Sequence, residues 1–196
     1  MNKYQFRLNK LANELTKLPE EKFNFAYFGD GKWEGDQLDL KPSKECGTTC
    51  CALGLAATMP FFRQLGLRMS KVNHNKIVVI NSLADVPMTN AGTHNYVVTR
   101  LSGNKIFGIN ESEYDYLFIP KGENEIEYCD DCPCTDSMCE LKHFSNKEFN
   151  PKNSMSMYCS AKDLSNHILS FIERKEPSSY SEIHPDMYYS YLTNDE

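Results

Sequence analysis

The eight cysteines of this 196-residue chain fall into two dense groups and one isolated position, Cys159. The first group lies within residues 46–51 and the second within residues 129–139. The N-terminal residues show neither an apolar signal region nor a small-residue cleavage site, so we expect a reducing, cytoplasmic compartment. There, clustered cysteines indicate metal ligands, reactive thiols or core residues before they indicate disulfides.

The second group predicts a metal site. Five soft ligands lie within 15 residues of polar sequence: Cys129, Cys132, Cys134, Cys139 and His143. Structural zinc takes four thiolate or imidazole ligands, and a C-x-x-C pair on a turn suits its tetrahedral geometry. We therefore expect structural zinc on Cys129, Cys132, Cys139 and His143, with Cys134 as the substitute ligand. Local disulfides and free thiols in a loop are the alternatives.

The first group allows three interpretations. A cysteine at a helix N-terminus can have a lowered thiol pKa, and Cys46 or Cys50 followed by His94 and Asn110, with Gln37 upstream, loosely fits a papain-like thiol hydrolase. Cys46 and Cys50 could also form a redox pair. We favour the third interpretation, in which these cysteines are small buried core residues at a tight helix junction.

Charge and hydropathy narrow the function classes. The chain has 21 basic and 27 acidic residues, a net charge of −6 and few arginines, which argues against a phosphate-gripping nucleic-acid surface. No stretch approaches the roughly 18–20 apolar residues of a membrane span. Residues 111–131 carry eight carboxylates and one lysine, Lys121. This segment predicts a solvated acidic face, or a surface that docks on a basic partner or mimics nucleic acid.

Hydrophobic periodicity predicts helices near both ends of the chain. The first carries an apolar stripe and ends at Pro19, because proline interrupts helical hydrogen bonding. Its stripe residues are Tyr4, Leu8, Leu11, Leu15 and Leu18. A second amphipathic helix begins near Ser160, includes Leu164 and Ile168, and ends before Pro177.

The middle of the chain predicts shorter elements. Thr48 or Thr49 is expected to cap a buried helix, and Pro60 to begin another that Gly66 ends. Residues 77–80 predict a strand, residues 96–99 a second strand, and the Gly-Asp-rich loop around Trp33 a turn. Asn110 with Glu113 predicts a capping box for a helix that stops at Pro120.

These elements predict a mainly helical α+β fold with one compact domain and a cysteine-rich irregular insertion. The domain comprises residues 1–120 plus 159–176. Residues 121–158 form the cysteine-rich, metal-binding segment, and residues 177–196 form a tyrosine-rich tail. The chain contains no internal repeat, so a repeat architecture is not expected.

Three segments carry a resemblance to a known family. They read LPEEKFNFAYF, ECGTTCCALGLAATMPFFRQLGL and FGINESEYDYLFIP. Their shared pattern is L-P-x-x-x-F, then C-G-T-x-x-C-x-x-G, then F-G-I and L-F, over residues 18–67 and 105–119. The chain thereby resembles a family of small uncharacterised bacteriophage and prophage proteins. The resemblance implies a mainly helical segment at 95–119 and carries no activity with it.

Together these observations favour a non-enzymatic phage accessory protein, located in the host cytoplasm, that binds a host or viral protein and holds a structural zinc. Nucleic acid and membrane are not expected as partners, and the sequence does not specify an oligomeric state. A papain-like thiol hydrolase that uses Cys46 or Cys50 with His94 is the first alternative. A virion component is the second.

Overall fold

The computed structural model describes residues 1–25, 32–34, 37–39, 51–72, 75–83, 92–120, 155–156, 158–176 and 179–180. The described elements, in chain order, are α1 (Lys3–Leu15), the 3-10 helix η1 (Glu20–Lys22), β1 (Lys32–Glu34), β2 (Gln37–Asp39), α2 (Ala52–Thr58), α3 (Pro60–Gln64), β3 (Leu67–Val72), β4 (Asn75–Ile80), the 3-10 helix η2 (Asn81–Leu83), α4 (Gly92–Phe107), α5 (Glu111–Phe118) and α7 (Ala161–Arg174). The protein is a mainly helical α+β fold, as the sequence predicted.

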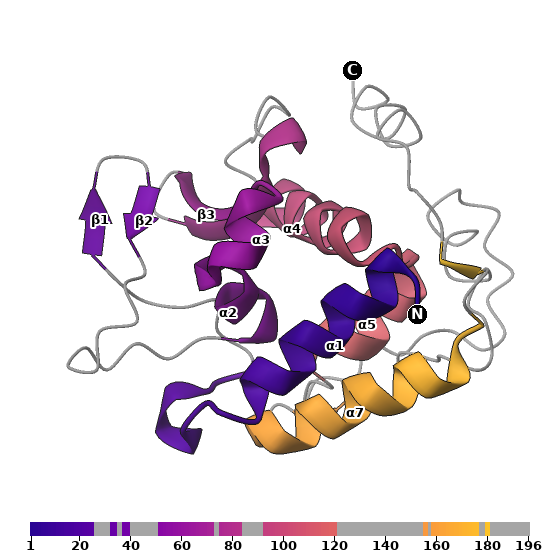
Figure 1. Ribbon diagram of the computed structural model, residues 1–196. Helices are drawn as coiled ribbons and strands as arrows, with labels where there is room; N and C mark the ends of the chain where they lie inside the picture. The colour runs from indigo at the N-terminus through magenta and orange to yellow at the C-terminus, as the bar shows by residue number, and fades with distance from the viewer. Residues whose placement is uncertain are drawn as a thin grey trace, which may run out of the picture.

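One antiparallel sheet lies at the side of the molecule opposite α7 (Figure 1). Its strand order is β1-β2-β3-β4, and its main hairpin pairs β3 with β4 from Leu67↔Ile80 to Val72↔Asn75. Helix α4 packs against β4, and α2 and α3 pack against β3. The amide of Ile80 also donates to Ser102 Oγ over 3.3 Å, which ties the end of the sheet to α4.

Helices α1 and α7 run antiparallel along the other side of the molecule (Figure 1). Each buries the apolar stripe that its sequence predicted. Their contact includes one buried polar bond, in which Ser165 Oγ donates to the carbonyl oxygen of Ala12 over 2.8 Å. This contact brings residues 153 positions apart into one core.

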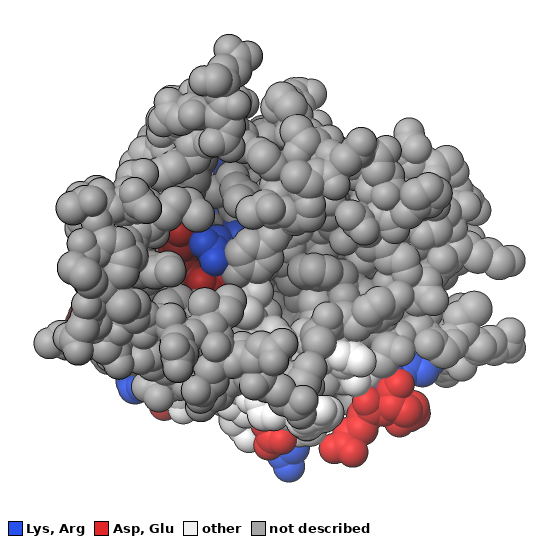
Figure 2. All heavy atoms as spheres, turned by 180° about the vertical axis from the view of Figure 1, so that it is seen from behind, with Lys and Arg blue, Asp and Glu red and all other residues white. Residues whose placement is uncertain are grey.

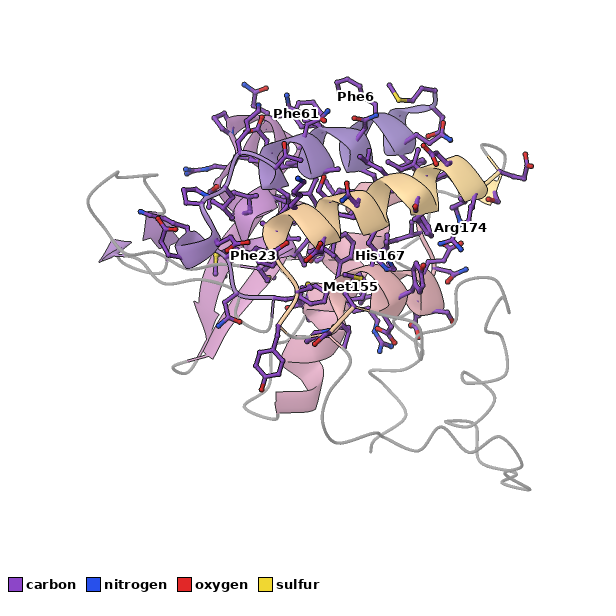
Figure 3. The ribbon with its side chains drawn as sticks, turned by 90° about the horizontal axis from the view of Figure 1, so that it is seen from below. Phe6, Phe23, Phe61, Met155, His167 and Arg174 are labelled. Atoms are coloured by element: carbon purple, nitrogen blue, oxygen red, sulfur yellow. The ribbon has the colours of Figure 1, made fainter. Side chains whose placement is uncertain are left out.

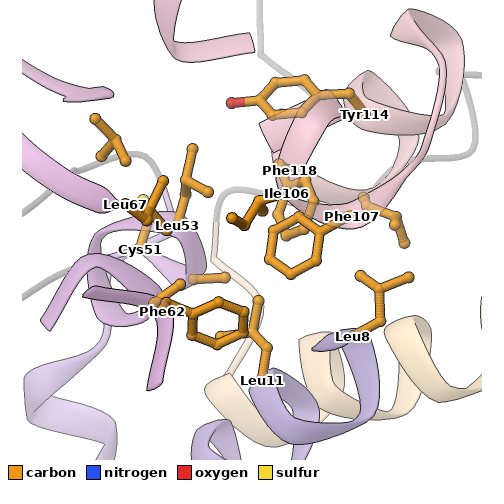
Figure 4. Close-up of a cluster of buried hydrophobic side chains, with 14 of the residues drawn as sticks. Leu8, Leu11, Cys51, Leu53, Phe62, Leu67, Ile106, Phe107, Tyr114 and Phe118 are labelled. Carbon is orange, nitrogen blue, oxygen red and sulfur yellow. The ribbon is translucent and has the colours of Figure 1, made fainter. Parts of the chain in front are cut away.

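The centre of the core is a run of aromatic rings between the helices and the sheet (Figure 4). The ring centroids of Phe62 and Phe107 lie 5.7 Å apart, and those of Phe107 and Phe118 lie 5.3 Å apart. Tyr114 extends the run at 5.3 Å from Phe118. Because each large ring buries much apolar area, these ring contacts stabilise the packing of α3, α4 and α5 against one another.

Two glycines allow neighbouring helices to approach α4 closely: Gly103 lies within α4, and Gly108 directly follows its last residue. Gly108 has φ +62°, and a Cβ placed on it would lie 2.5 Å from the ring of Tyr4 on α1. A Cβ on Gly103 would clash with the ring of Tyr114 on α5. Only glycine fits both positions without displacing a core aromatic.

Most predicted helices and the strand at 77–80 are confirmed. Helix α1 ends before Pro19, α3 begins at Pro60, and Gly66 follows α3 with φ +90°. The caps of α5 and α7 are Asn110 and Ser160, each in a capping box.

Three local predictions were wrong. Residues 96–99 lie inside helix α4, because burial of Val98 and Thr99 in the helical core overrides their β propensity. The N-cap of α2 is Cys51 and neither threonine. The predicted turn around Trp33 contains strand β1, where Trp33 pairs in register with Leu38 of β2.

Candidate functional site

Cys51 is the described member of the first cysteine group. It lies at the N-cap of α2 with 5% of its surface exposed, and its Sγ accepts a hydrogen bond from the amide of Gly54 over 3.4 Å. Burial raises the pKa of the Cys51 thiol to about 11, and the helix-end hydrogen bonds lower it by less. Cys51 therefore has the environment of a core cysteine. Cys46 and Cys50 lie outside the described residues.

The two other residues of the hydrolase hypothesis occupy helical positions. His94 lies in the first turn of α4, so its backbone is helical there. Asn110 caps α5, and its side-chain oxygen accepts the amide of Glu113 over 2.9 Å. Among the described residues, the structure assembles no cysteine–histidine–asparagine trio, and it gives Asn110 a structural role.

The five predicted zinc ligands, Cys129, Cys132, Cys134, Cys139 and His143, lie outside the described residues. Within the described ranges, no three side chains of His, Cys, Asp or Glu come together as a metal site. Cys159 is half-buried, and burial with the nearby Asp163 carboxylate raises the pKa of its thiol to about 11. The zinc site therefore remains a prediction from the sequence.

The acidic residues of α5 are engaged inside the molecule. Arg100 on α4 donates to Glu111 over 3.2 Å and to Asp115 over 2.9 Å. Glu113 pairs with Lys175, and both side chains are almost completely buried. Three of the eight carboxylates in the predicted acidic face therefore have internal cationic partners. The other five, at 123–131, lie outside the described residues.

An exposed aromatic and basic surface lies where α1 meets α3. We call it the α1–α3 face. It comprises Phe6, Lys10, Phe61 and Leu65, with Arg63 exposed on the same short helix. Phe6 is 46% exposed and Leu65 38% exposed, so both present apolar surface to solvent.

Three side chains of the α1–α3 face, those of Phe6, Lys10 and Phe61, contact one another. The rings of Phe6 and Phe61 meet edge to face with centroids 5.7 Å apart, and Lys10 Nζ lies 5.2 Å from the centroid of Phe61. Figure 3 shows Phe6 and Phe61 beside each other on the outer side of α1, away from His167. Phe61 in turn contacts the buried Phe62 at 5.1 Å. The face is thus anchored to the core on one side and open on the other.

The sequence contained part of this signal. Phe6 lies between Tyr4 and Leu8 and outside the buried stripe, on the side of the helix that also carries Lys10. An aromatic residue on the polar side of an amphipathic helix is a signal that periodicity alone can find. The contact with Phe61, 55 residues further on, depends on the tertiary fold.

A second cluster of side chains, around buried Tyr116, lies between α5 and α7. His167 Nε2 lies 3.1 Å from the carbonyl oxygen of Tyr116, and the two rings lie 4.3 Å apart. Arg174 donates to the Tyr116 hydroxyl over 2.7 Å. Burial lowers the pKa of His167, and the Arg174 charge lowers it further. These contacts join α5 to α7.

Charges of both signs lie beside each other on the opposite side of the molecule (Figure 2). No extended basic area is seen among the described residues of that face.

Comparison with protein-family models, with curated proteins and with solved structures returned no match. The resemblance to phage proteins therefore stays an expectation. Among the described helices, none has the length and apolar character that crossing a bilayer requires.

Proposed function

We propose that this chain is a non-enzymatic accessory protein that binds another protein through its α1–α3 face. The observation that carries the proposal is the exposed Phe6 ring, packed edge to face on Phe61 beneath the Lys10 ammonium. Aromatic residues, phenylalanine among them, are enriched in the core of protein–protein interfaces relative to the rest of the surface. Leu65, the C-cap residue of α3, is also exposed.

The geometry suits binding because little reordering is required. Phe61 is braced against buried Phe62, and α1 is held by its long contact with α7. A preformed surface loses less side-chain entropy on association than a flexible one. The contacts seen within the face support a rigid docking surface.

The setting of this function rests on the sequence. The resemblance to phage proteins supports a role in the host cytoplasm, with a host or viral protein as the partner.

The cysteines at 129–139 with His143 support structural zinc in the 121–158 segment. Elemental analysis of the purified full chain tests the zinc: about one equivalent is expected. Less than about half an equivalent would contradict it.

Differential capture from a lysate of the producing cell tests the binding function. The full chain and the variant Phe6→Ser with Leu65→Ser are compared, with Tyr158→Ser as the control because Tyr158 is 78% exposed on another segment. We expect a saturable partner that is retained by the wild type and the control and lost by the double variant. Equal retention by all three proteins, or no saturable partner, would contradict the proposal.

A further inference from the structure

We infer that Tyr180 is a latch over the buried Glu113–Lys175 ion pair, and that this latch opens while the rest of the core stays folded. Tyr180 follows α7 by a few residues and is 8% exposed. It is preceded by a turn in which the amide and the hydroxyl of Ser179 both donate to the carbonyl oxygen of Glu176. The inference concerns a conformational change within this chain and does not depend on the proposed binding function.

Aromatic and cationic neighbours hold the ring of Tyr180. The ring stacks on Tyr4 of α1, with centroids 6.3 Å apart and planes inclined by 10°, and it meets Phe171 of α7 edge to face at 6.4 Å. Lys175 Nζ lies 4.8 Å from its centroid. The ring therefore lies against the start of α1 and the end of α7, with the Lys175 ammonium beside it.

The ion pair beside the ring depends on being shielded from water. The side chains of Glu113 and Lys175 are almost completely buried. Glu113 belongs to the capping box of α5, and Lys175 is the C-cap residue of α7. Attraction between charges is much stronger in a protein interior than in water, and an ion pair exposed to solvent contributes little. The position of the Tyr180 ring therefore controls how strongly the start of α5 is joined to the end of α7.

The hydroxyl of Tyr180 weakens the closed position. It is buried and has no hydrogen-bond partner among the described residues. Burial, and then the Glu113 charge, raise the pKa of this hydroxyl, so it stays protonated. A buried polar group without a partner carries its full desolvation cost, whereas water satisfies it when the latch opens. The closed position is therefore held by the ring and not by the hydroxyl.

The contacts that hold the neighbouring helices do not involve Tyr180. Glu113 accepts the amide of Asn110, and the amide of Lys175 donates within α7. Helices α1 and α7 are joined by the bond from Ser165 to Ala12 and by their buried stripes. Water that enters hydrates both charges and the hydroxyl, so opening leaves no group unsatisfied. Local opening of this kind requires less free energy than global unfolding.

Acetylation of Lys175 reports the opening, because its buried amine is reachable only when the Tyr180 ring has moved. Wild type, Tyr180→Phe and Tyr180→Ala are treated with N-hydroxysuccinimidyl acetate, and modified lysines are mapped by mass spectrometry. Exposed Lys162 is the internal control. Relative to Lys162, we expect Lys175 to react about tenfold faster in Tyr180→Ala than in wild type. Tyr180→Phe keeps the ring and loses the unpartnered hydroxyl, so we expect it to react no faster than wild type.

Two further measurements separate local opening from global unfolding. Gly66→Ala is a control variant that destabilises the fold at a glycine with φ +90°, away from the latch. Wild type is also acetylated along a urea series, with global unfolding followed by circular dichroism, so the test does not require Tyr180→Ala to fold. We expect Lys175 to become reactive at urea concentrations below the unfolding transition.

The following results would overturn the latch and leave the binding function standing. One is Lys175 acetylation in wild type that rises only in step with global unfolding. Another is an increase in Gly66→Ala as large as that in Tyr180→Ala. Equal rates in Tyr180→Ala and wild type, or a faster rate in Tyr180→Phe than in wild type, would also overturn it.

Discussion

The ammonium group of Lys175 contacts the carboxylate of Glu113 inside the core, where the two side chains are 4% and 3% exposed. The second carboxylate oxygen of Glu113 accepts the amide of Asn110 over 2.9 Å, which completes the capping box of α5. Lys175 Nζ also lies 5.7 Å from the ring centroid of Phe171 and 4.8 Å from that of Tyr180. The Glu113–Lys175 pair therefore links the start of α5, the end of α7 and the segment at residue 180.

Replacing Glu113 by glutamine is expected to destabilise the fold strongly. Glutamine can still serve in the capping box, but it leaves the Lys175 ammonium buried without an opposite charge. Breaking a buried ion pair in this way costs about 3–5 kcal/mol. Urea unfolding of the wild type and Glu113→Gln measures the loss in the free energy of unfolding.

A double variant provides the control. Lys175→Met leaves the Glu113 carboxylate buried without its cation, and the pair Glu113→Gln with Lys175→Met leaves no buried charge. We expect the double variant to lose less stability than the sum of the two single losses. Additive losses, or a loss below about 1 kcal/mol for Glu113→Gln, would show that the pair is not desolvated as described.

Gly108→Ala is expected to destabilise the protein more than Gly66→Ala. Both glycines have positive φ, at +62° and +90°, where an L-residue costs about 1–2 kcal/mol. The added Cβ at position 108 would also lie 2.5 Å from the Tyr4 ring, whereas at position 66 its nearest neighbour lies at an ordinary 3.4 Å. Overpacking adds about 1–3 kcal/mol to the first variant alone.

Thermal and urea unfolding of both glycine variants test this difference. Each loss is measured against the wild type under the same conditions, and the difference between the two losses then removes the backbone cost that both variants share. Equal losses for the two variants would contradict the close approach of Tyr4 to Gly108.

The elements that were predicted correctly from the sequence are those whose signals come from residues close together in the chain. The stripe of α1, Pro60 at the start of α3 and the Asn110 and Ser160 capping boxes each depend on residues within one or two turns. Their signals do not require knowledge of the tertiary contacts. The structure confirms them for that reason.

The failed predictions depend on contacts between distant residues. Residues 97–99 are β-branched and favour a strand, but Val98 and Thr99 are buried in the core as part of helix α4. Strand β3 was missed because its polar residues Arg68, Ser70 and Lys71 give a weak apolar pattern, and its pairing with β4 forms it. The α1–α3 face was missed because Phe6 and Phe61 become neighbours only through the packing of two helices.

Cys51 is expected to resist alkylation in the folded protein. Its thiol is 5% exposed and has a pKa of about 11, so the thiolate population near neutral pH is very small. Iodoacetamide treatment at mild pH, followed by peptide mass mapping, measures modification at each cysteine before and after unfolding in urea. We expect modification of Cys51 only after unfolding.

The same mapping tests the hydrolase hypothesis. Rapid labelling of Cys46 or Cys50 alone would identify a reactive thiol and favour that alternative. Resistance of both would remove the nucleophile it requires. Modification of Cys51 in the folded protein at the rate of a free thiol would contradict its burial at the α2 N-cap.

His167 is expected to make the folded protein less stable as the pH falls. Its pKa is lowered from about 6.5 mainly by burial, while the unfolded chain protonates at the ordinary value. Below about pH 6.5 the unfolded state therefore binds the proton more readily, and folding stability decreases until the pH has passed through the folded pKa, by up to about 1.4 kcal/mol per pH unit. The neutral imidazole also contacts the Tyr116 carbonyl oxygen and faces the Arg174 cation.

Urea unfolding of wild type and His167→Gln between about pH 5 and 7 isolates this contribution, because the other four histidines titrate in both proteins. Glutamine retains an N–H donor for Tyr116, and we expect its stability to depend less steeply on pH. Parallel pH profiles for the two proteins would show that burial does not shift the His167 proton equilibrium.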